Sequence, residues 1–373
     1  MRAYLDWNAT TPPRAEVLDA MREAAARAWA NPSSVHGDGR AARAVVEAAR
    51  AAVAELVGTD ARDVVFTSGG TEANNLALRS ALPREGEPAV LVTSRLEHPS
   101  VTRVAEALER EGRARVRWLD VTPAGAIDLG DLDRALEEGA ALVTVQAVNH
   151  ETGVLAPVAE VIARAHAAGA RVHVDAVQGW GKVAVPPGWD TASVAPHKMR
   201  GPKGIGALAT RPGARIDPVL LGGAQEKGLR PGTVDAALAA GFGVAARIAA
   251  RSAERWAALA DLRDRIEREL LAIEAPRGHA RVAGDATRRA PHVSNLLWPG
   301  WIGAELVAAL DLEGVSVSSG AACSAGTVEP SPVLLAMLGA ADAARGVRVS
   351  IGDATTEDDA ARAVRAFRAV LGR

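Results

Sequence analysis

Short apolar runs alternate with longer stretches of helical spacing along most of the chain. Runs with the length of buried strands lie at residues 64–67, 89–93, 115–119, 142–147, 171–175 and 206–210. Apolar residues recur at helical spacing at residues 16–30, from a break at 31–34 to about 57, and at 68–81, 100–110, 129–137, 158–168 and 234–258. Strands that alternate with helices predict an α/β fold, with a mostly parallel sheet covered on both faces.

This alternation changes after about residue 255. The pattern there predicts a charged helix over 255–273, extended segments over 293–298 and 348–351, a helix over 302–310 and a last helix from 357. Residues 318–326, in the middle of this region, are rich in glycine, serine and alanine. The mixture predicts a second, smaller α+β domain.

Charge and composition exclude several classes of protein. The net charge is −2 and the pI is about 6.5, so no basic surface for nucleic acid or an anionic membrane is expected. No apolar run reaches the length of about 18 residues that spans a bilayer, and residues 1–15 lack a signal-peptide profile. One cysteine excludes an internal disulfide framework and a cysteine-rich zinc site, and the eight histidines lack metal-ligand spacing. We therefore expect a cytoplasmic protein without a metal site.

Lysine is scarce in this sequence. Only four of the 43 lysines and arginines are lysine, and they lie close together at Lys182, Lys198, Lys203 and Lys227. Because arginine cannot be deprotonated in proteins, a lysine retained in such a background points to a role for the neutral amine. Codon bias is the alternative explanation for the excess of arginine.

Residues 171–206 combine an acid, a lysine and a stiff turn. The predicted strand at 171–175 ends on Asp175, and ligands of parallel sheets bind beyond the carboxyl ends of the strands. Lys198 precedes a turn rich in glycine and proline, which also holds a rival lysine, Lys203. The alternatives are a helix N-cap for Asp175 and a surface position for Lys198.

The turn at residues 68–71 is a candidate anion site. Its two glycines join a strand to the start of a helix, where free backbone N–H groups attract anions. An anion site, Asp175 and Lys198 together match the phosphate, the ring nitrogen and the aldehyde of pyridoxal phosphate. His98, which follows a strand, could cover the ring, although a helix start is the alternative interpretation.

Two further residues are candidates for chemistry. Cys323 lies in the small, flexible segment at 318–326 rather than in an apolar strand, although a lone cysteine is most often an inert core residue. A free thiol is mostly protonated at neutral pH, so a reactive role for Cys323 needs a base or cation from elsewhere in the fold. Arg348 alternates with apolar neighbours and could bind a substrate carboxylate, but a structural salt bridge is the favoured alternative.

These segments together resemble a known family. The chain resembles the cysteine desulfurases of the iron–sulfur-assembly type, which are class V, fold-type I pyridoxal phosphate enzymes. The resemblance covers nearly the whole chain and rests on residues 4–11, 31–36, 67–75, 97–98, 148–153, 173–178, 197–206, 230–233 and 318–324. It implies a seven-stranded, mostly parallel sheet in a large domain (14–255) and a small α+β domain (1–13 and 256–373) that carries the cysteine loop.

The resemblance also implies roles for matched positions. Lys198 would bind the cofactor covalently and move the substrate Cα proton, and His98 would stack on the ring as acid and base. Asp175 would pair with the ring nitrogen, and Gln178 with the phenolic oxygen. The remaining cofactor and substrate contacts would come from Gly70, Thr71 and His197 at the phosphate, Thr233 from the second subunit of a homodimer, and Asn149 with Arg348 at the substrate carboxylate.

The sulfur step would depend on Cys323. Its thiol would take the sulfur of L-cysteine as a persulfide, leaving L-alanine, and pass it to an acceptor or iron–sulfur scaffold protein. The length of the segment from Cys323 to residue 331 resembles the long-loop group of the family, which serves several acceptors. Housekeeping relatives continue past the last helix into a tail that docks the scaffold, so a chain ending at Arg373 is expected to differ in that partner.

The chain departs from the family pattern at four positions. Ala195 stands where a phosphate-binding serine is usual, Pro231 where serine is usual, His150 where asparagine is common and Asp353 where a basic residue is common. Two alternatives therefore stay open. One is a selenocysteine lyase or another class V lyase or aminotransferase, and the other is a catalytically silent sulfur carrier or scaffold-binding protein.

Overall fold

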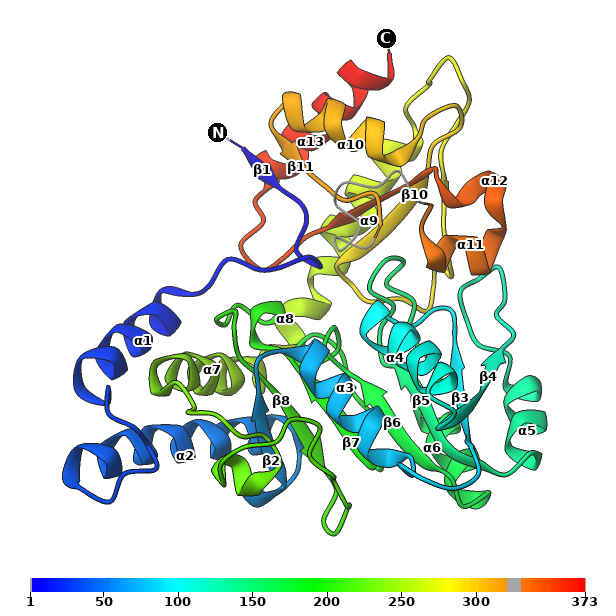
Figure 1. The fold of residues 1–373 in the computed structure, drawn as a ribbon. Coiled ribbons are helices and arrows are strands. Elements are labelled where there is room, and N and C mark those ends of the chain that lie inside the picture. Colours follow the sequence, from blue (N-terminus) through cyan, green and yellow to red (C-terminus); the bar gives the residue numbers. More distant parts are fainter. Residues whose placement is uncertain (1, 321–329, 373) are drawn as a thin grey trace.

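The computed structural model describes residues 2–320 and 330–372 (Figure 1). The predictions for Cys323 and its neighbours therefore lie outside the described residues. No helix within the described ranges is long and apolar enough to cross a membrane.

A seven-stranded sheet forms the centre of the larger part of the molecule. Its strand order is β2-β8-β7-β6-β5-β3-β4, and only β8 runs antiparallel to its neighbours. This confirms the predicted mostly parallel α/β sheet. The strands are β2 (Val64–Thr67), β3 (Ala89–Ser94), β4 (Ala114–Leu119), β5 (Ala140–Gln146), β6 (Arg171–Asp175), β7 (Thr191–Val194) and β8 (Gly206–Thr210).

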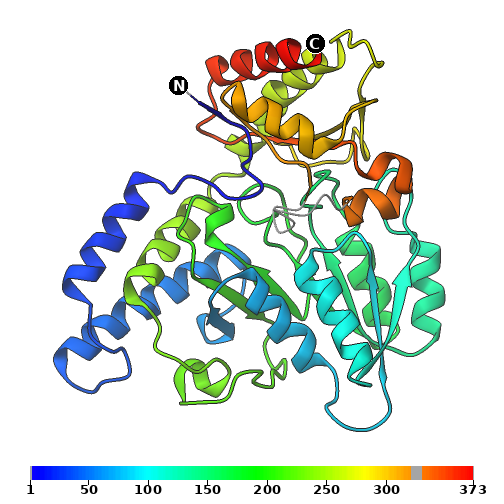
Figure 2. The same cartoon turned by 45° about the horizontal axis from the view of Figure 1, so that its top comes forward.

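Helices cover both faces of this sheet (Figure 2). Val65 and Leu91 pack under α3 (Gly70–Ala81) and α4 (Pro99–Arg110), whereas the neighbouring Val64 belongs to the core on the opposite face. This alternation follows from the period of two along a strand. The opposite face is covered by α2 (Gly37–Val57), α5 (Leu129–Glu137), α6 (Val158–Ala167) and α7 (Ala236–Ala249), with α1 (Ala15–Arg27) packed on α7.

Two elements differ from the sequence prediction. The strand β7 was not predicted, because it has only four residues and includes alanine and serine. The helix predicted at 234–258 is broken into α7 and α8 (Ala253–Ala257), with the charged helix α9 (Leu259–Leu271) following. The Ser252 hydroxyl donates to the Gly181 carbonyl at 2.6 Å, which anchors the chain at the break.

The C-terminal part has its own sheets, helices and core. Its strands β9 (Arg281–Val282), β10 (Val293–Leu297) and β12 (Gly346–Ser350) are antiparallel, and β1 (Ala3–Tyr4) pairs with β11 (Val315–Ser316). The helices are α9, α10 (Gly303–Leu312), α11 (Pro332–Leu338), α12 (Ala340–Ala343) and α13 (Glu357–Leu371). A core that includes Leu5, Ile266 and Phe367 favours the division at 14 and 255, which we propose as the domain bounds. The helix α11 instead packs into the core of the larger part through Val333 and Met337.

The N-terminal arm connects the two parts of the molecule. The Asn8 amide donates to Ser350 Oγ at 3.0 Å, and the Thr11 amide donates to the His197 carbonyl at 3.0 Å. The arm therefore joins the end of β12 to the segment that carries Lys198.

Replacing Gly352 with alanine should loosen this arm. A Cβ atom at Gly352 would overlap the ring of Trp7, which is buried. Overpacking of this kind costs about 1–3 kcal/mol, so we expect Gly352→Ala to lower the melting temperature measured by calorimetry. The control is Gly37→Ala, because the nearest atom to a Cβ there is a flexible Arg40 side-chain nitrogen at 3.8 Å. Equal melting temperatures for the two variants would contradict the prediction.

Candidate active site

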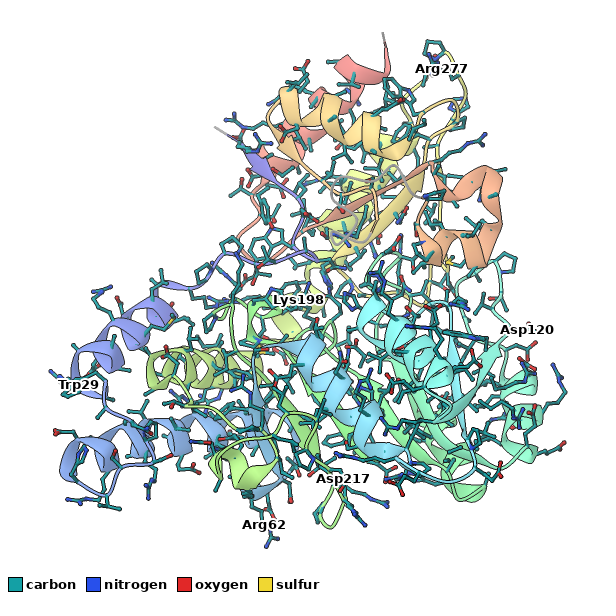
Figure 3. The ribbon with its side chains drawn as sticks, in the orientation of Figure 1. Trp29, Arg62, Asp120, Lys198, Asp217 and Arg277 are labelled. Carbon is teal, nitrogen blue, oxygen red and sulfur yellow. The ribbon has the colours of Figure 1, made fainter. Side chains whose placement is uncertain are left out.

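A cavity of about 230 Å³ lies at the carboxyl ends of the central strands. Its walls come from the sheet, the N-terminal arm and β12, so residues distant in sequence meet there. In Figure 3, Lys198 lies at the centre of the molecule, whereas the other labelled residues lie at its periphery. The predicted site residues that line the cavity are Gly70, Thr71, His98, Asp175, Gln178, His197, Lys198 and Arg348.

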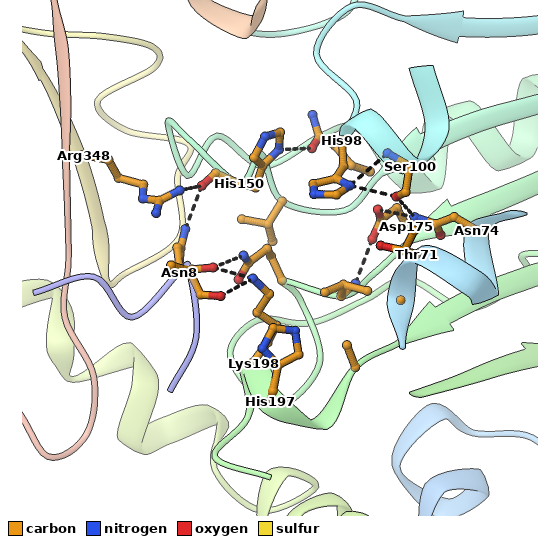
Figure 4. A pocket seen from close by; sticks show the side chains of 17 residues that line it. Asn8, Thr71, Asn74, His98, Ser100, His150, Asp175, His197, Lys198 and Arg348 are labelled. Atoms are coloured by element: carbon orange, nitrogen blue, oxygen red, sulfur yellow. Dashed lines mark hydrogen bonds between the residues drawn. The ribbon is translucent and has the colours of Figure 1, made fainter. Parts of the chain in front are cut away.

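Lys198 is held at the wall of this cavity (Figure 4). It ends the short 3₁₀ helix Pro196–Lys198, and its Nζ atom donates to the Asn8 carbonyl at 2.6 Å and to the Ala9 carbonyl at 2.9 Å. The rival Lys203 is exposed and is not among the residues that line the cavity. Of the two lysines, only Lys198 is positioned for chemistry there.

Asp175 presents a buried carboxylate at the end of β6. Its Oδ2 atom accepts a hydrogen bond from Asn74 Nδ2 at 2.8 Å. Its Oδ1 atom accepts from the Val177 amide at 3.1 Å and from the Ser193 hydroxyl at 3.3 Å. These donors orient the carboxylate and satisfy it inside the protein.

A chain of hydrogen bonds continues from Asp175 through Asn74 to a neutral histidine. Burial lowers the pKa of His173 to about 4, against the opposing charge of Asp175. The neutral ring donates from Nε2 to Asn74 Oδ1 at 3.0 Å and accepts at Nδ1 from the Thr191 hydroxyl at 2.9 Å. Asn74 Nδ2 is thereby directed at both Asp175 and the Ser100 hydroxyl, each at 2.8 Å.

The same network defines the tautomer of His98, the N-cap residue of α4. The Ser100 amide donates to His98 Nδ1 at 3.1 Å, and Ser100 Oγ lies 2.8 Å from the same nitrogen. Burial lowers the pKa of His98, the Asp175 charge opposes this shift and the Lys198 charge adds to it. A neutral His98 with Nδ1 as acceptor carries its hydrogen on Nε2. The ring also meets the His150 ring edge-on, with centroids 5.3 Å apart.

Glu97 is a buried carboxyl group beside this site. Its Oε1 atom accepts from the Gln146 amide at 2.7 Å. Burial, together with the Asp175 charge, raises the pKa of Glu97 to about 8, so the group is mostly neutral at pH 7. Glu97 does not line the cavity, and as a neutral group it adds no second negative charge near Asp175.

The start of α3 lines the cavity and is its candidate anion-binding end. The first backbone N–H groups of a helix have no partner within it, and the helix dipole favours negative charge there. A Cβ atom at Gly70 would lie 2.8 Å from Val177 Cγ2, so glycine keeps the backbone accessible. Ala195 lines this end and cannot supply the hydroxyl contact of the usual serine.

His197 also lines the cavity, as a neutral ring. Its Nδ1 atom lies 3.2 Å from Thr10 Oγ1. Burial, reinforced by the Lys198 charge, lowers the pKa of His197 to about 3. A neutral imidazole can still donate one hydrogen bond to an anion.

Arg348 is both an ion-pair residue and a cavity residue. Its Nη2 atom donates to Asp6 Oδ1 at 2.6 Å and its Nη1 atom donates to the His150 carbonyl at 2.8 Å. The structural salt bridge considered from the sequence is therefore present. Within the described ranges the buried Arg348 Nε atom has no hydrogen-bond partner. Nη1 and Nη2 each carry a second hydrogen, so the guanidinium at the cavity wall keeps donors for a ligand.

Two predicted residues do not line the cavity. The Asn149 side chain donates to the Leu96 carbonyl at 3.1 Å and accepts from the amides of Glu151 and Thr152 at 2.9 and 2.8 Å. Thr233 is exposed. The contacts predicted for Asn149, and for Thr233 from a second subunit, stay predictions.

Sequence reasoning missed three residues that organise the site: Asn8, Asn74 and Ser100. Asn74 was within reach of sequence reasoning, because it lies one helical turn after Gly70 and so faces the same side. Asn8 offered no local signal, since it is brought to the cavity by the path of the arm.

The groups present fit a pyridoxal phosphate cofactor. A lysine amine, a carboxylate held by three donors and a helix N-terminus face one cavity, as the aldehyde, ring nitrogen and phosphate of that cofactor require. The fold and this set of groups define a fold-type I pyridoxal phosphate enzyme as the class.

The comparisons with known proteins agree with this class. Residues 3–362 match the model of the family described as Aminotransferase class-V. The chain belongs to this family, whose members are in general dependent on pyridoxal phosphate.

The curated relatives are cysteine desulfurases. The chain is 41% identical to a cysteine desulfurase of Cereibacter sphaeroides over 95% of this chain and 92% of the relative. It is 37% identical to the cysteine desulfurase IscS 1 of Archaeoglobus fulgidus over 99% and 97% of the two chains. These relatives confirm the family resemblance predicted from the sequence.

Solved structures agree as well. A NifS-like protein superposes with a TM-score of 0.91 at 29% identity, covering 100% of this chain and 99% of its own. SspA in complex with cysteine superposes with a TM-score of 0.80 at 28% identity, covering 95% of this chain and 100% of its own. These matches confirm the predicted fold type.

Proposed function

We propose that this protein is a pyridoxal phosphate-dependent cysteine desulfurase that converts L-cysteine to L-alanine and receives the sulfur on Cys323. The observation that carries the proposal is the meeting of Lys198, Asp175 and the start of α3 at one cavity, in a chain 41% identical to a cysteine desulfurase. The cysteine present in the SspA structure supports the choice of substrate.

The cofactor would be held at three points. Lys198 would bind its aldehyde carbon, Asp175 would pair with its ring nitrogen, and the start of α3 with His197 would bind its phosphate. When bound, the cofactor supplies an electron sink that makes the Cα proton of an amino-acid substrate acidic. Gln178 would donate to the phenolic oxygen, and His98 would cover the ring.

The residues around the cavity are suited to hold and move protons. Once its amine is released from the cofactor, Lys198 can accept the Cα proton, and the carbonyls of Asn8 and Ala9 keep the amine at the cavity. His98 can donate a proton from Nε2 because its Nδ1 atom is occupied by Ser100. Arg348, which lines the cavity, would bind the substrate carboxylate through the N–H hydrogens that its bonds to Asp6 and His150 leave over.

The sulfur step would use the thiolate of Cys323. Its sulfur would attack the substrate sulfur, so that an S–S bond forms and the C–S bond breaks. The electron pair of the broken bond stays with the substrate carbon, which takes up a proton and becomes the methyl group of alanine. Cys323 is left as a persulfide, and an acceptor thiol or scaffold protein then removes the outer sulfur.

The same proposal covers the oligomeric state of the enzyme, its sulfur acceptor and its cellular location. The active site would be completed across a homodimer by Thr233 of the second subunit. The acceptor would be a protein of iron–sulfur cluster or thio-cofactor synthesis in the cytoplasm.

Replacing Cys323 with alanine should separate cofactor binding from sulfur transfer. The Cys323→Ala variant should keep the visible absorption band of the bound cofactor, because Lys198 and Asp175 are unchanged. It should lose sulfide release from L-cysteine by at least about 100-fold, since the nucleophile is absent. The measurement is sulfide formed per minute in the presence of a thiol reductant, with absorption spectra as the control.

Sulfide release at the wild-type rate in this variant would contradict the persulfide step. Faster turnover of selenocysteine than of cysteine by the wild type would favour the selenocysteine lyase alternative. A protein that stays colourless with added pyridoxal phosphate would favour the silent sulfur carrier.

A further inference from the structure

A second lysine, Lys182, is buried beside the active site, and the proposed reaction does not use it. Its side chain is 2% exposed, although lysine is almost never buried without a partner. Its Nζ atom donates to Gln178 Oε1 at 3.0 Å and lies 5.2 Å from the centre of the Trp256 ring. It is also one of only four lysines in a chain whose other basic side chains of this kind are arginines.

The surroundings of Lys182 disfavour a charged amine. Burial, reinforced by the charges of Lys198 and Arg348, lowers the pKa of Lys182 well below its ordinary value. Arginine at this position would bring a permanent charge and a larger head group into the same space. A neutral amine can occupy the site and still donate a hydrogen bond.

The hydrogen bond from Lys182 helps to determine which way the Gln178 amide points. With Oε1 bound to Lys182, the Gln178 amide nitrogen is directed to the other side, where it donates to the Asn8 carbonyl at 2.9 Å. The same carbonyl oxygen accepts from Lys198 Nζ at 2.6 Å. The two lysines are thus connected through Gln178 and Asn8, and Gln178 lines the cavity.

The backbone around Lys182 keeps this arrangement in place. Lys182 follows Gln178 by four residues in a tight turn, and its amide donates to the Gly179 carbonyl at 3.0 Å. Gly181 has φ = 73°, and a Cβ atom there would lie 2.7 Å from Ala249 Cβ. A side chain at Gly181 would therefore push the turn away from α7.

We propose that Lys182 is a positioning residue that fixes the Gln178 amide with its nitrogen toward the cavity. An amide nitrogen carries two hydrogens, and the second one, beyond the bond to Asn8, would bind an oxygen of the cofactor ring. The inference rests on the proposed function, since the oxygen that Gln178 would meet is the phenolic oxygen of pyridoxal phosphate. Without Lys182, only the bond to the Asn8 carbonyl opposes a rotation of the Gln178 amide that would present its carbonyl oxygen to that atom.

The test is a double-mutant cycle on cofactor binding. The variants are Lys182→Met, Gln178→Leu and the pair, each prepared as apoprotein and titrated with pyridoxal phosphate, with absorption spectra recorded across pH. We expect Lys182→Met to raise the dissociation constant about tenfold, as loss of one directed hydrogen bond to a charged oxygen does, and to shift the pH midpoint of the cofactor band. The double variant should bind no more weakly than Gln178→Leu alone, because Lys182 acts through Gln178.

Lys227→Met is the matched control, because Lys227 is exposed and does not line the cavity. It should leave the dissociation constant of pyridoxal phosphate and the pH midpoint of the cofactor band unchanged. Independent, additive effects of the two substitutions, or a wild-type dissociation constant in Lys182→Met, would overturn the inference. If Lys182→Met does not fold, Lys182→Leu, which also lacks a donor, replaces it in the same cycle with the same criteria. A wild-type protein that binds no pyridoxal phosphate would instead overturn the proposed function.

Discussion

Replacing Lys198 with alanine is expected to abolish desulfuration, with a fall in turnover of about 1000-fold or more. The substitution removes both the amine that would bind the cofactor and the group that would accept the Cα proton. Arg348 and Lys182 cannot substitute, because the first is held by Asp6 and the second by Gln178. The measurement is alanine formed from L-cysteine, together with the absorption band of the covalently bound cofactor, which should disappear.

Lys203→Ala provides the control for this prediction, because Lys203 is an exposed lysine five residues further along the chain. It should keep the cofactor band and turnover near the wild-type level. Retention of the covalent band in Lys198→Ala would contradict the assignment of Lys198, and its loss in Lys203→Ala would transfer the role to Lys203.

Replacing Asp175 with asparagine should lower turnover by about 100-fold or more, as loss of one electrostatic contact in a buried site does. The variant keeps the size of the side chain but removes the charge that would face the ring nitrogen. It also breaks the local network, because an amide nitrogen at the Oδ2 position would meet the Asn74 amide nitrogen, donor against donor. Asn74 cannot rotate to compensate without losing its bond from His173.

The measurement is turnover with L-cysteine at saturating pyridoxal phosphate, so that weaker cofactor binding is separated from slower chemistry. Asp120→Asn is the control, because Asp120 is an exposed aspartate outside the cavity (Figure 3). A turnover for Asp175→Asn within a factor of two of the wild type would contradict a role for this charge.

Much of the fold was predictable because its elements carry strong local patterns. The buried strand at Arg171–Asp175 reads as an apolar run ending on an acid, and the structure has it at the predicted residues. Helices such as Leu129–Glu137 have the apolar spacing that their packing requires. The short strand Thr191–Val194 was missed because its burial comes from the neighbouring strands on both sides rather than from its own composition.

The candidate site was predictable where a residue follows directly on a strand or starts a helix. Asp175 ends a strand, His98 and Gly70 start helices, and the carboxyl ends of parallel strands meet at one edge of the sheet. Asn8 was not predictable, because its position depends on hydrogen bonds to Ser350 and Gln178 from distant segments. The scarcity of lysine pointed to a short window but did not distinguish catalytic from positioning residues.

The structure also gives a physical reason for two of the four lysines in the chain. Lys198 and Lys182 are joined through Gln178 and the Asn8 carbonyl. A permanent guanidinium charge would be unsuitable in both positions. Lys198 would bond to an aldehyde, which requires a neutral amine, and Lys182 is buried away from water. Lys203 and Lys227 are exposed and need no such explanation.

The most direct test of the central claim is the amount of L-alanine formed in a single turnover. Protein loaded with pyridoxal phosphate is mixed with L-cysteine in the absence of any other thiol, and alanine is counted per subunit. We predict a rapid burst of about one alanine per subunit, because each Cys323 can hold one sulfur, followed by a slower phase that speeds up when a thiol reductant is added. The absence of alanine, or a burst that persists after alkylation of Cys323, would contradict the account.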